Sequence, residues 1–397
     1  MGIFMIKNNY FPGTDINCAY TETSVSFDPQ LPLGQEAGTM LHTDAKELIP
    51  PGIMLLEDGG LRLNCVAAEA ARVEAVVHNK KYALKKDENG LWSLEIHIGC
   101  SGFNPVMFYI DGAEVLNPLA PIGFGASRAI NYIDIPEKDN DFYLCKEVPH
   151  GSVVQEYYYS GTTNSMKSCL VYTPAGYMNE TAGKYPVLYL QHGHGENEQC
   201  WIHQGKANFI FDNLIAEKKM KPCIVVMNNG MVQKDVNGLK ELKVSCIEGL
   251  LIEDCIPFIE SRYRVKTDKW NRGMAGLSMG SLQTSMVTLK HPDLFGYAGV
   301  FSGFVGPISG LAMEELSYMK ELDNKEKFEN DFKIFFRAVG DEDFVALDRF
   351  TADSKLFRDK GLAPQNCPMH VEKFYHGEHE WNVWRMCLHD FAQYLFK

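Results

Sequence analysis

The sequence predicts an α/β protein with a mainly parallel sheet, preceded by an all-β domain. From residue 185 onward, short apolar runs alternate with longer segments of helical periodicity, which is the pattern of right-handed βαβ crossovers. Before residue 141, short β-type runs are separated by turn dipeptides, as in a small β-sandwich. The change of pattern places a boundary near residue 150 and predicts two domains, 1–150 and 151–397.

The N-terminal domain is predicted from four β-type runs and the glycine turns between them. The runs cover 60–66, 72–77, 91–98 and 106–110, and the turns are Asp58-Gly-Gly60, Asn89-Gly90 and Asp111-Gly112. Such spacing favours an immunoglobulin-like sandwich. The stretch Asn117–Gly125 contains two prolines and two glycines and is predicted to be irregular coil.

The C-terminal domain is predicted from six apolar strands and five helices. The strands cover 187–190, 223–227, 272–277, 297–301, 333–339 and 370–375, and the helices 206–218, 241–262, 279–290, 345–359 and 381–395. In parallel sheets of this kind the functional groups lie at the carboxyl ends of the strands.

Composition narrows the class of protein. The chain has 397 residues, of which 45% are hydrophobic and 22% charged, and a net charge of −13. We therefore expect a globular protein that binds neither nucleic acid nor anionic membranes. The N-terminal residues 1–7 do not resemble a secretory signal. The eleven cysteines are scattered and form no C-x-x-C pair, which favours free thiols in the cytoplasm.

The strongest motif is Gly276-Leu-Ser278-Met-Gly280, which lies between a predicted strand and a predicted helix. Glycines two residues on either side of a serine allow the sharp turn that raises its hydroxyl above the sheet edge. This context predicts an α/β-hydrolase fold with Ser278 as the nucleophile.

A nucleophilic serine requires a base and an acid, which follow it in that fold in the order serine, acid, histidine. Asp341, Glu342 and Asp343 follow one predicted strand, and His376 and His379 follow the next. We predict Asp343 as the acid. We predict His379 as the base because it lies in the loop before the last helix.

An oxyanion hole needs two N–H donors. One is expected from Met279, and the other from His194 or Gly195 in the loop Gln191-His-Gly-His-Gly195. The two histidines of this loop also suggest a metal site. No further ligands follow at the usual spacing, so we predict no metal and assign His192 to local hydrogen bonding.

Several motifs together resemble the feruloyl esterase and acetyl xylan esterase family, carbohydrate esterase family 1. They are Gln191–Trp201, Gly205–Ala216, Gly276–Gln283, His291–Phe295 and Gly377–Arg385. The resemblance covers about residues 150–397 and implies the same nucleophile, acid and base. Ser281 stands where the family usually has a second glycine, which should narrow the space behind the nucleophile. More weakly, the N-terminal domain resembles the family 48 carbohydrate-binding-like domains that precede some of these esterases.

The resemblance implies a serine esterase, without a cofactor, that acts on hydroxycinnamoyl esters of plant cell-wall saccharides. The ligand would be a small-molecule ester or a feruloylated oligosaccharide. The alternatives are a siderophore trilactone esterase, an acetyl xylan esterase, a formyl-thioester hydrolase and a carbohydrate-binding protein with an inactive hydrolase domain.

Aromatic side chains near these motifs are candidates for substrate binding. Trp201 and Trp381 could stack on an aromatic acyl group or sugar, with packing as the alternative. Phe124 is expected to reach the catalytic cleft. The N-terminal domain could bind glycan through Trp92, Phe124 or Tyr132. The alternative is a supporting role at the cleft or in a homodimer.

Overall fold

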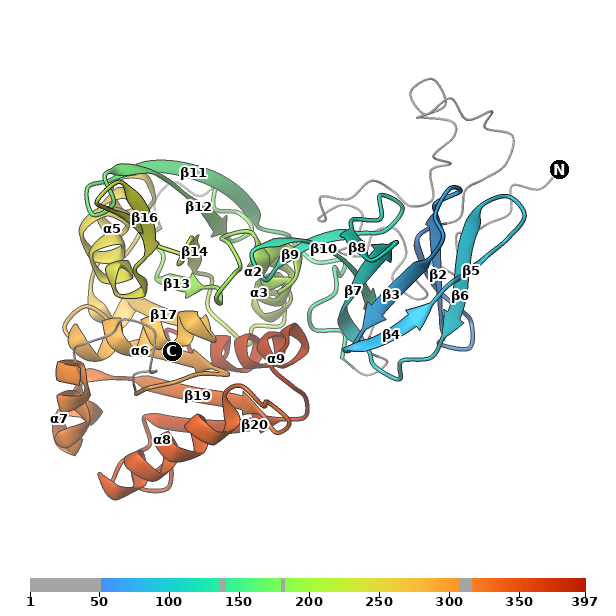
Figure 1. Ribbon diagram of the computed structural model, residues 1–397. Helices are drawn as coiled ribbons and strands as arrows, with labels where there is room; N and C mark the ends of the chain where they lie inside the picture. Colours follow the sequence, from blue (N-terminus) through green and yellow to red (C-terminus); the bar gives the residue numbers. More distant parts are fainter. Residues whose placement is uncertain (1–50, 136, 138–139, 180–182, 307–315) are drawn as a thin grey trace. The chain divides into compact units, whose positions relative to one another are not determined.

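The computed structural model describes residues 51–135, 137, 140–179, 183–306 and 316–397 (Figure 1). The chain divides into two compact units, Met1–Cys145 and Lys146–Lys397. The N-terminal residues 1–7, whose composition suggested the absence of a signal, lie outside the described residues. Within the described ranges, no helix is long and apolar enough to cross a membrane.

The N-terminal unit consists of two antiparallel sheets. The first has the order β1-β2-β6-β5, and the second β4-β3-β7-β10-β9 with β8 paired to β7. The strands are β1 (Ile53–Leu55), β2 (Leu61–Val66), β3 (Val73–Val77), β4 (Lys80–Ala83), β5 (Lys85–Lys86), β6 (Leu91–Ile96), β7 (Gly102–Ile110), β8 (Ala113–Val115), β9 (Ile122–Gly125) and β10 (Arg128–Ile135).

One hydrophobic cluster joins these two sheets. Alternate residues of β2 and β3, such as Leu63 and Ala75, belong to it together with Trp92, as expected when side chains alternate across a strand. Trp92 is 7% exposed and Tyr132 is 1% exposed. Both rings are therefore part of the interior, and the prediction that they offer a glycan-binding surface is wrong.

The segment predicted to be coil contains a strand. Residues Ile122–Gly125 form β9 and pair with β10 through Arg128 to Asn131. Glycine and proline within the segment weaken the strand signal. Its pairing depends on a neighbour that local composition does not reveal.

The C-terminal unit contains an eight-stranded sheet of order β11-β12-β14-β13-β17-β18-β19-β20. The pairs β11–β12 and β12–β14 are antiparallel, and the remaining pairs are parallel. The strands are β11 (Ser152–Ser160), β12 (Ser165–Thr173), β13 (Val187–Gln191), β14 (Ile224–Asn228), β17 (Arg272–Leu277), β18 (Tyr297–Phe301), β19 (Ile334–Gly340) and β20 (His370–Tyr375). A separate hairpin joins β15 (Gln233–Val236) to β16 (Leu239–Leu242). The predicted mainly parallel sheet is thus confirmed.

Helices connect the parallel strands. They are α2 (Cys200–His203), α3 (Ala207–Ala216), α4 (Ile247–Gly249), α5 (Ile256–Arg262), α6 (Met279–Lys290), α7 (Lys325–Asp331), α8 (Leu347–Asp359) and α9 (Trp381–Ala392), with the 3₁₀ segments η2 (Val244–Cys246), η4 (Lys269–Asn271) and η5 (Leu316–Asp323) and the π-helix η3 (Leu250–Cys255). The single helix predicted over 241–262 is wrong at its start, where residues 241–242 belong to β16, and residues 244–262 form four consecutive helical segments, η2, α4, η3 and α5. Pro257 has no N–H for a regular helical bond at the start of α5, where the backbone leaves the π-helix.

The two faces of this sheet are covered by different helices. On one face, residues such as Tyr189, Met274 and Phe335 pack with the side chains of η3, α5, α6, α7 and α8. On the other face, the Phe301 and Phe336 rings lie 5.7 and 5.6 Å from the Phe391 ring of α9. The burial of both faces explains why the central strands are almost continuously apolar.

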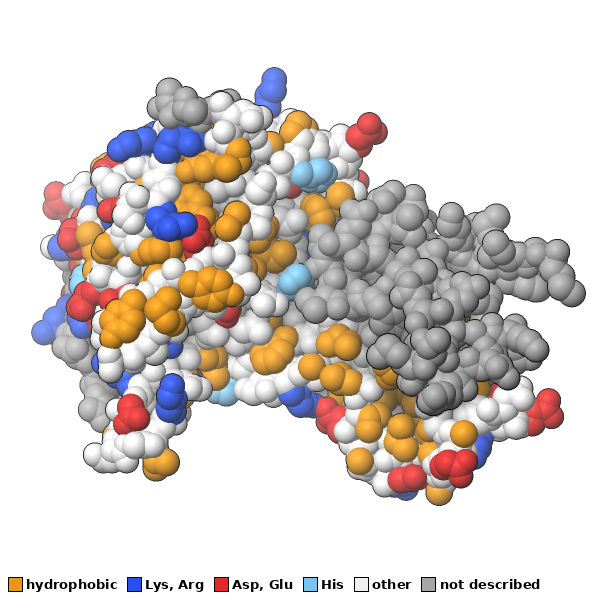
Figure 2. Space-filling model, turned by 90° about the horizontal axis from the view of Figure 1, so that it is seen from above, with side chains coloured by type: hydrophobic (Ala, Val, Ile, Leu, Met, Phe, Trp, Pro, Cys, Tyr) orange, Lys and Arg blue, Asp and Glu red, His pale blue; other side chains and the backbone are white. Residues whose placement is uncertain are grey.

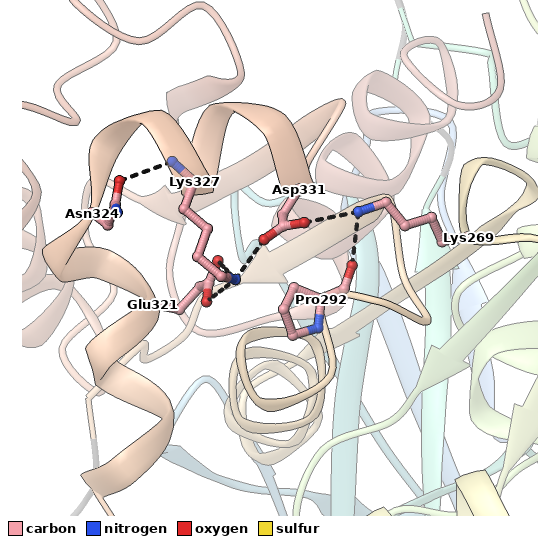
Figure 3. Close-up of polar contacts among 6 residues, drawn as sticks. All are labelled: Lys269, Pro292, Glu321, Asn324, Lys327 and Asp331. Atoms are coloured by element: carbon pink, nitrogen blue, oxygen red, sulfur yellow. Dashed lines mark hydrogen bonds and ion pairs between the residues drawn. The ribbon is translucent and has the colours of Figure 1, made fainter.

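An ion-pair network lies beside α7 (Figure 3). Lys327 donates to Glu321 of η5 and to Asp331 at distances of 2.7 and 2.6 Å. Asp331 also accepts from Lys269, whose Nζ in turn donates to the Pro292 carbonyl oxygen. The network therefore ties α7 to η5 and to the segment that precedes β17.

The surface is mixed in charge. Acidic and basic side chains are interspersed over the described part of the face shown in Figure 2, together with apolar side chains. In the C-terminal unit, the exposed apolar residues include Tyr157 and Tyr159 of the edge strand β11 and Met166 of β12.

Candidate active site

Ser278 lies in a sharp turn between the end of β17 and the start of α6. Its backbone has φ 51° and ψ −117°, a strained conformation for a residue with a side chain. A Cβ on Gly276 would lie 2.5 Å from the Gly280 carbonyl oxygen, and one on Gly280 would lie 2.6 Å from that of His192. Both glycines are therefore needed for the backbones to meet at this turn.

The His379 imidazole faces this serine. Its Nε2 lies 2.9 Å from Ser278 Oγ, and its Nδ1 lies 2.9 Å from Asp343 Oδ2. Because an ionised carboxylate only accepts hydrogen bonds, Nδ1 carries the proton and Nε2 accepts from the serine hydroxyl. The His379 ring packs against Trp384 in a T-shaped arrangement, with ring centres 5.2 Å apart. The imidazole is thus oriented by one polar and one aromatic neighbour.

Asp343 is fully buried in the loop after β19. Burial would raise the pKa of its carboxyl group, but the hydrogen bond and charge interaction with His379 outweigh this and lower the pKa below its ordinary value. The backbone N–H groups of Val345 and Ala346 also donate to Oδ1. The carboxylate is consequently ionised and fixed in orientation.

The rival acid and base candidates pair with each other instead. His376 Nδ1 lies 3.3 Å from Asp341 Oδ1, and both side chains are largely exposed. Glu342 is also exposed. The structure thus brings Ser278, His379 and Asp343 into one hydrogen-bonded line and leaves the alternatives at the surface. Such a line can take a proton from the serine hydroxyl and stabilise the resulting imidazolium ion.

The candidate oxyanion donors lie in the loop after β13 and at the start of α6. In the described part of the chain, the N–H groups of Met279 and His194 have no protein acceptor. The Gly195 N–H instead donates to Met231 Sδ at 3.4 Å. Of the two predicted donors in this loop, His194 is therefore better available to a substrate.

His192 lies beneath this loop and is fully buried. Its Nδ1 donates to the Gly193 carbonyl oxygen and its Nε2 accepts from the Gly230 N–H, both at 2.8 Å. Burial lowers the pKa of His192 to about 4. Both ring nitrogens are engaged, as expected for local hydrogen bonding. Among the described residues, no group of three or more His, Cys, Asp or Glu side chains is arranged to hold a metal ion.

Two of the predicted substrate-binding residues are internal. Trp201 has no exposed surface and its Nε1 donates to the Gln191 carbonyl oxygen at 2.9 Å. Trp381 is 4% exposed, and its ring meets that of Trp201 edge-on. These rings fill the space between α2 and α9, so the prediction that they stack on substrate is wrong. Phe124 lies half-buried in β9 of the other unit, and its role stays a prediction.

One buried carboxyl group of the site, Glu196, carries no sequence motif that predicts its place. It accepts from the Gly193 N–H at 2.8 Å, and an interaction with the Trp381 side chain lowers the pKa of its carboxyl group. Burial raises the pKa of Glu196 to about 7. Only its position directly after the glycine loop could have drawn attention to it, since its burial depends on the tertiary fold.

Two curated relatives cover different shares of the chain. An endo-1,4-beta-xylanase/feruloyl esterase of Xylanibacter ruminicola is 38% identical over 324 residues, or 79% of this chain and 41% of that protein. The endo-1,4-beta-xylanase Y of Acetivibrio thermocellus is 31% identical over 193 residues, or 45% of this chain and 16% of that protein. The chain thus spans less than half the length of either relative.

Solved structures share the fold. The CE1 ferulic acid esterase of Anaeromyces mucronatus in complex with ferulic acid matches with a TM-score of 0.56 and 22% identity, over 65% of this chain and 95% of that one. The enterobactin esterase of Shigella flexneri matches with a TM-score of 0.61 and 14% identity, over 86% and 96%. At these identities the likeness concerns the fold alone.

A family model described as putative esterase matches residues 160–394. This match covers more than half of the chain and includes Ser278, Asp343 and His379. Together with the 38% identity to the xylanase/feruloyl esterase, it shows that the chain belongs to the putative esterase family.

Proposed function

We propose that the protein is a serine carboxylesterase that hydrolyses feruloyl-type esters of plant cell-wall saccharides. The observation that carries the proposal is the hydrogen-bonded line from Ser278 through His379 to Asp343. The name of the 38% identical relative, which includes feruloyl esterase, supports the choice of acyl group. Membership in an esterase family supports the reaction class.

In this mechanism His379 Nε2 accepts the Ser278 proton while Oγ attacks the ester carbonyl carbon. The N–H groups of Met279 and His194 are proposed to stabilise the oxyanion. Collapse of the tetrahedral intermediate breaks the ester C–O bond, and the imidazolium gives its proton to the leaving alcohol. Water, deprotonated by His379, then cleaves the acyl-enzyme and releases the acid and the free serine. Asp343 keeps Nδ1 protonated throughout, and no cofactor takes part.

Initial rates on three esters test this proposal. The substrates are methyl ferulate, para-nitrophenyl acetate and an enterobactin-type trilactone, with Ser278→Ala as the blank. A preference for ferulate in kcat/KM supports the proposal, whereas turnover of the trilactone alone would move the function to siderophore hydrolysis. Equal turnover by wild type and Ser278→Ala would contradict a serine mechanism, because loss of the nucleophile should cost several orders of magnitude.

For the N-terminal unit we propose an immunoglobulin-like fold with a supporting role. The burial of Trp92 and Tyr132 supports a role other than glycan binding through these rings. Pulldown of Ser278→Ala protein on feruloylated and unmodified xylan tests this. Retention of the Ser278→Ala protein on unmodified xylan would favour a separate glycan site.

A further inference from the structure

Glu196 occupies a special position between two loops of the site. Its side chain is largely buried, with 9% of the residue exposed. Oε2 accepts from the Gly193 N–H at 2.8 Å, and a hydrogen-bonding interaction with the Trp381 side chain lowers the pKa of the same carboxyl group. Burying a carboxyl group is unfavourable unless hydrogen bonds compensate for the lost hydration. The interactions with Gly193 and Trp381 therefore offset part of the cost of burying this carboxyl group.

Gly193 and Trp381 belong to the two segments whose relative position must stay fixed during the reaction. Gly193 directly precedes His194, and a Cβ on Gly193 would lie 3.4 Å from Ser278 Cβ. Trp381 is the first residue of α9 and follows His379 by two positions. The carboxyl group thus connects the loop of the proposed oxyanion donor to the loop of the proposed base.

We propose that Glu196 is a positioning residue, whose carboxylate fixes the distance between the oxyanion loop and the His379 loop. This inference rests on the proposed function. Glu196 acts through its two hydrogen bonds and does not contact the substrate. An error of about 1 Å in such a distance can cost roughly 100-fold in rate.

The protonation state of Glu196 should affect this connection. Burial raises the pKa of the carboxyl group to about 7, against the opposite effect of its bonds to Gly193 and Trp381. The Cys200 thiol faces it from α2, and burial together with the Glu196 charge raises the pKa of that thiol, so Cys200 stays neutral and adds no charge. An ionised carboxylate accepts stronger hydrogen bonds than a neutral carboxyl group. The connection is therefore firmest above pH 7 and weakens as pH falls.

The pH profile of Glu196→Gln tests the proposal, because glutamine keeps the shape but removes the titrating charge and one of the two acceptor oxygens. We expect kcat for para-nitrophenyl acetate to fall roughly 10- to 100-fold with KM changed less than about twofold. In wild type, the acid limb of log kcat/KM should be steeper than in the variant below about pH 7, because protonation of Glu196 adds to the loss of activity.

Glu198→Gln is the matched control. Glu198 lies in the same loop, is 8% exposed, and accepts from Ser168 and Asn229 instead. We expect this variant to keep the steep acid limb. A Glu196→Gln enzyme with wild-type kcat and an unchanged limb would overturn the proposal, as would an equal change of slope in both variants.

Two further measurements keep the result independent of folding and of the proposed function. Trp381→Phe removes only one of the two donors and should lower kcat in the same direction. Hydrogen exchange of the backbone, followed by mass spectrometry, should increase in both 191–196 and 377–381 in Glu196→Gln. Unchanged exchange in both segments would overturn the proposal about Glu196. This holds even if the wild-type protein hydrolyses no ester, and such a lack of hydrolysis would separately contradict the proposed function.

Discussion

The Ser278 hydroxyl oxygen lies 2.9 Å from His379 Nε2, although 101 positions separate the two residues in the chain. They are brought together because the strands that precede them end on the same side of the sheet. Ser278 follows β17, Asp343 follows β19 and His379 follows β20. Because these strands are parallel, their carboxyl ends meet at that edge.

Asp343→Asn should separate orientation from acidity. An asparagine amide can donate to Nδ1, which favours the tautomer whose Nε2 is protonated and unable to accept from Ser278. We expect kcat to fall roughly 10³- to 10⁴-fold with little change in KM. Asp341→Asn is the control, since Asp341 forms an ion pair with the exposed His376 and not with His379. A similar loss in both variants would argue against the assignment of Asp343.

Trp201→Phe should reduce stability and leave substrate affinity intact. The change removes a buried hydrogen bond to the Gln191 carbonyl oxygen and part of the packing against Trp381. We expect the free energy of unfolding to fall by about 2–4 kcal/mol, measured by urea denaturation, while KM for methyl ferulate stays within about twofold. A large rise in KM at unchanged stability would restore a role for Trp201 in substrate stacking.

Ser281 and Gly303 should show strong energetic coupling. Ser281 donates to the Ser278 carbonyl oxygen and accepts from the Phe304 N–H. A Cβ on Gly303 would lie 1.7 Å from Ser281 Oγ and 2.2 Å from its Cβ. Gly303→Ala alone should therefore be severely destabilising, and Ser281→Gly should partly rescue it.

A double-mutant cycle measures this coupling. We expect an interaction free energy of about 1–3 kcal/mol in favour of the double variant. Additive effects would mean that the two residues do not compete for the same space. The cycle also tests whether serine at this position narrows the space behind the nucleophile, as the sequence comparison with the family suggests.

Much of the fold could be predicted because its signals are local. The strand His370–Tyr375 and the helix Met279–Lys290 begin and end in the structure where the sequence predicts. The order of serine, acid and histidine indicated the side chains that now form one hydrogen-bonded line. The glycines around Ser278 and the ends of the apolar runs are enough to predict where these site residues lie.

The remaining features depend on tertiary contacts. Trp201 has the same aromatic side chain whether it binds substrate or fills the interior, and only its burial decides. Glu196 would be an ordinary loop carboxylate without the Trp381 indole, which lies 185 positions further along the chain. The strand Ile122–Gly125 likewise needs β10 as a partner.

The dependence of stability on pH should reflect buried histidines. Burial, with the nearby charge of Arg337, lowers the pKa of His370 to about 3, and burial lowers that of His192 to about 4. Between about pH 4 and 6.5, the unfolded chain binds protons at these residues and the folded protein does not. Stability should therefore fall as pH decreases through this range, by up to about 1.4 kcal/mol per pH unit for each histidine.

Glu196 should act in the opposite direction. Because burial raises the pKa of its carboxyl group to about 7, the folded protein holds a proton there between about pH 4.5 and 7 that the unfolded chain has released. Its contribution to stability is present below pH 4.5 and is lost as pH rises through 7. Glu196 thus offsets part of the effect of the histidines in wild type.

Urea denaturation of wild type and Glu196→Gln between pH 4.5 and 7 separates these contributions. Without the titrating carboxyl group, the free energy of unfolding should rise more steeply with pH, by up to about 1.4 kcal/mol per unit. The matched Glu198→Gln variant should keep the wild-type slope. If the Glu196→Gln slope equals that of wild type, Glu196 does not titrate in this range, and the steep acid limb of activity would require another group.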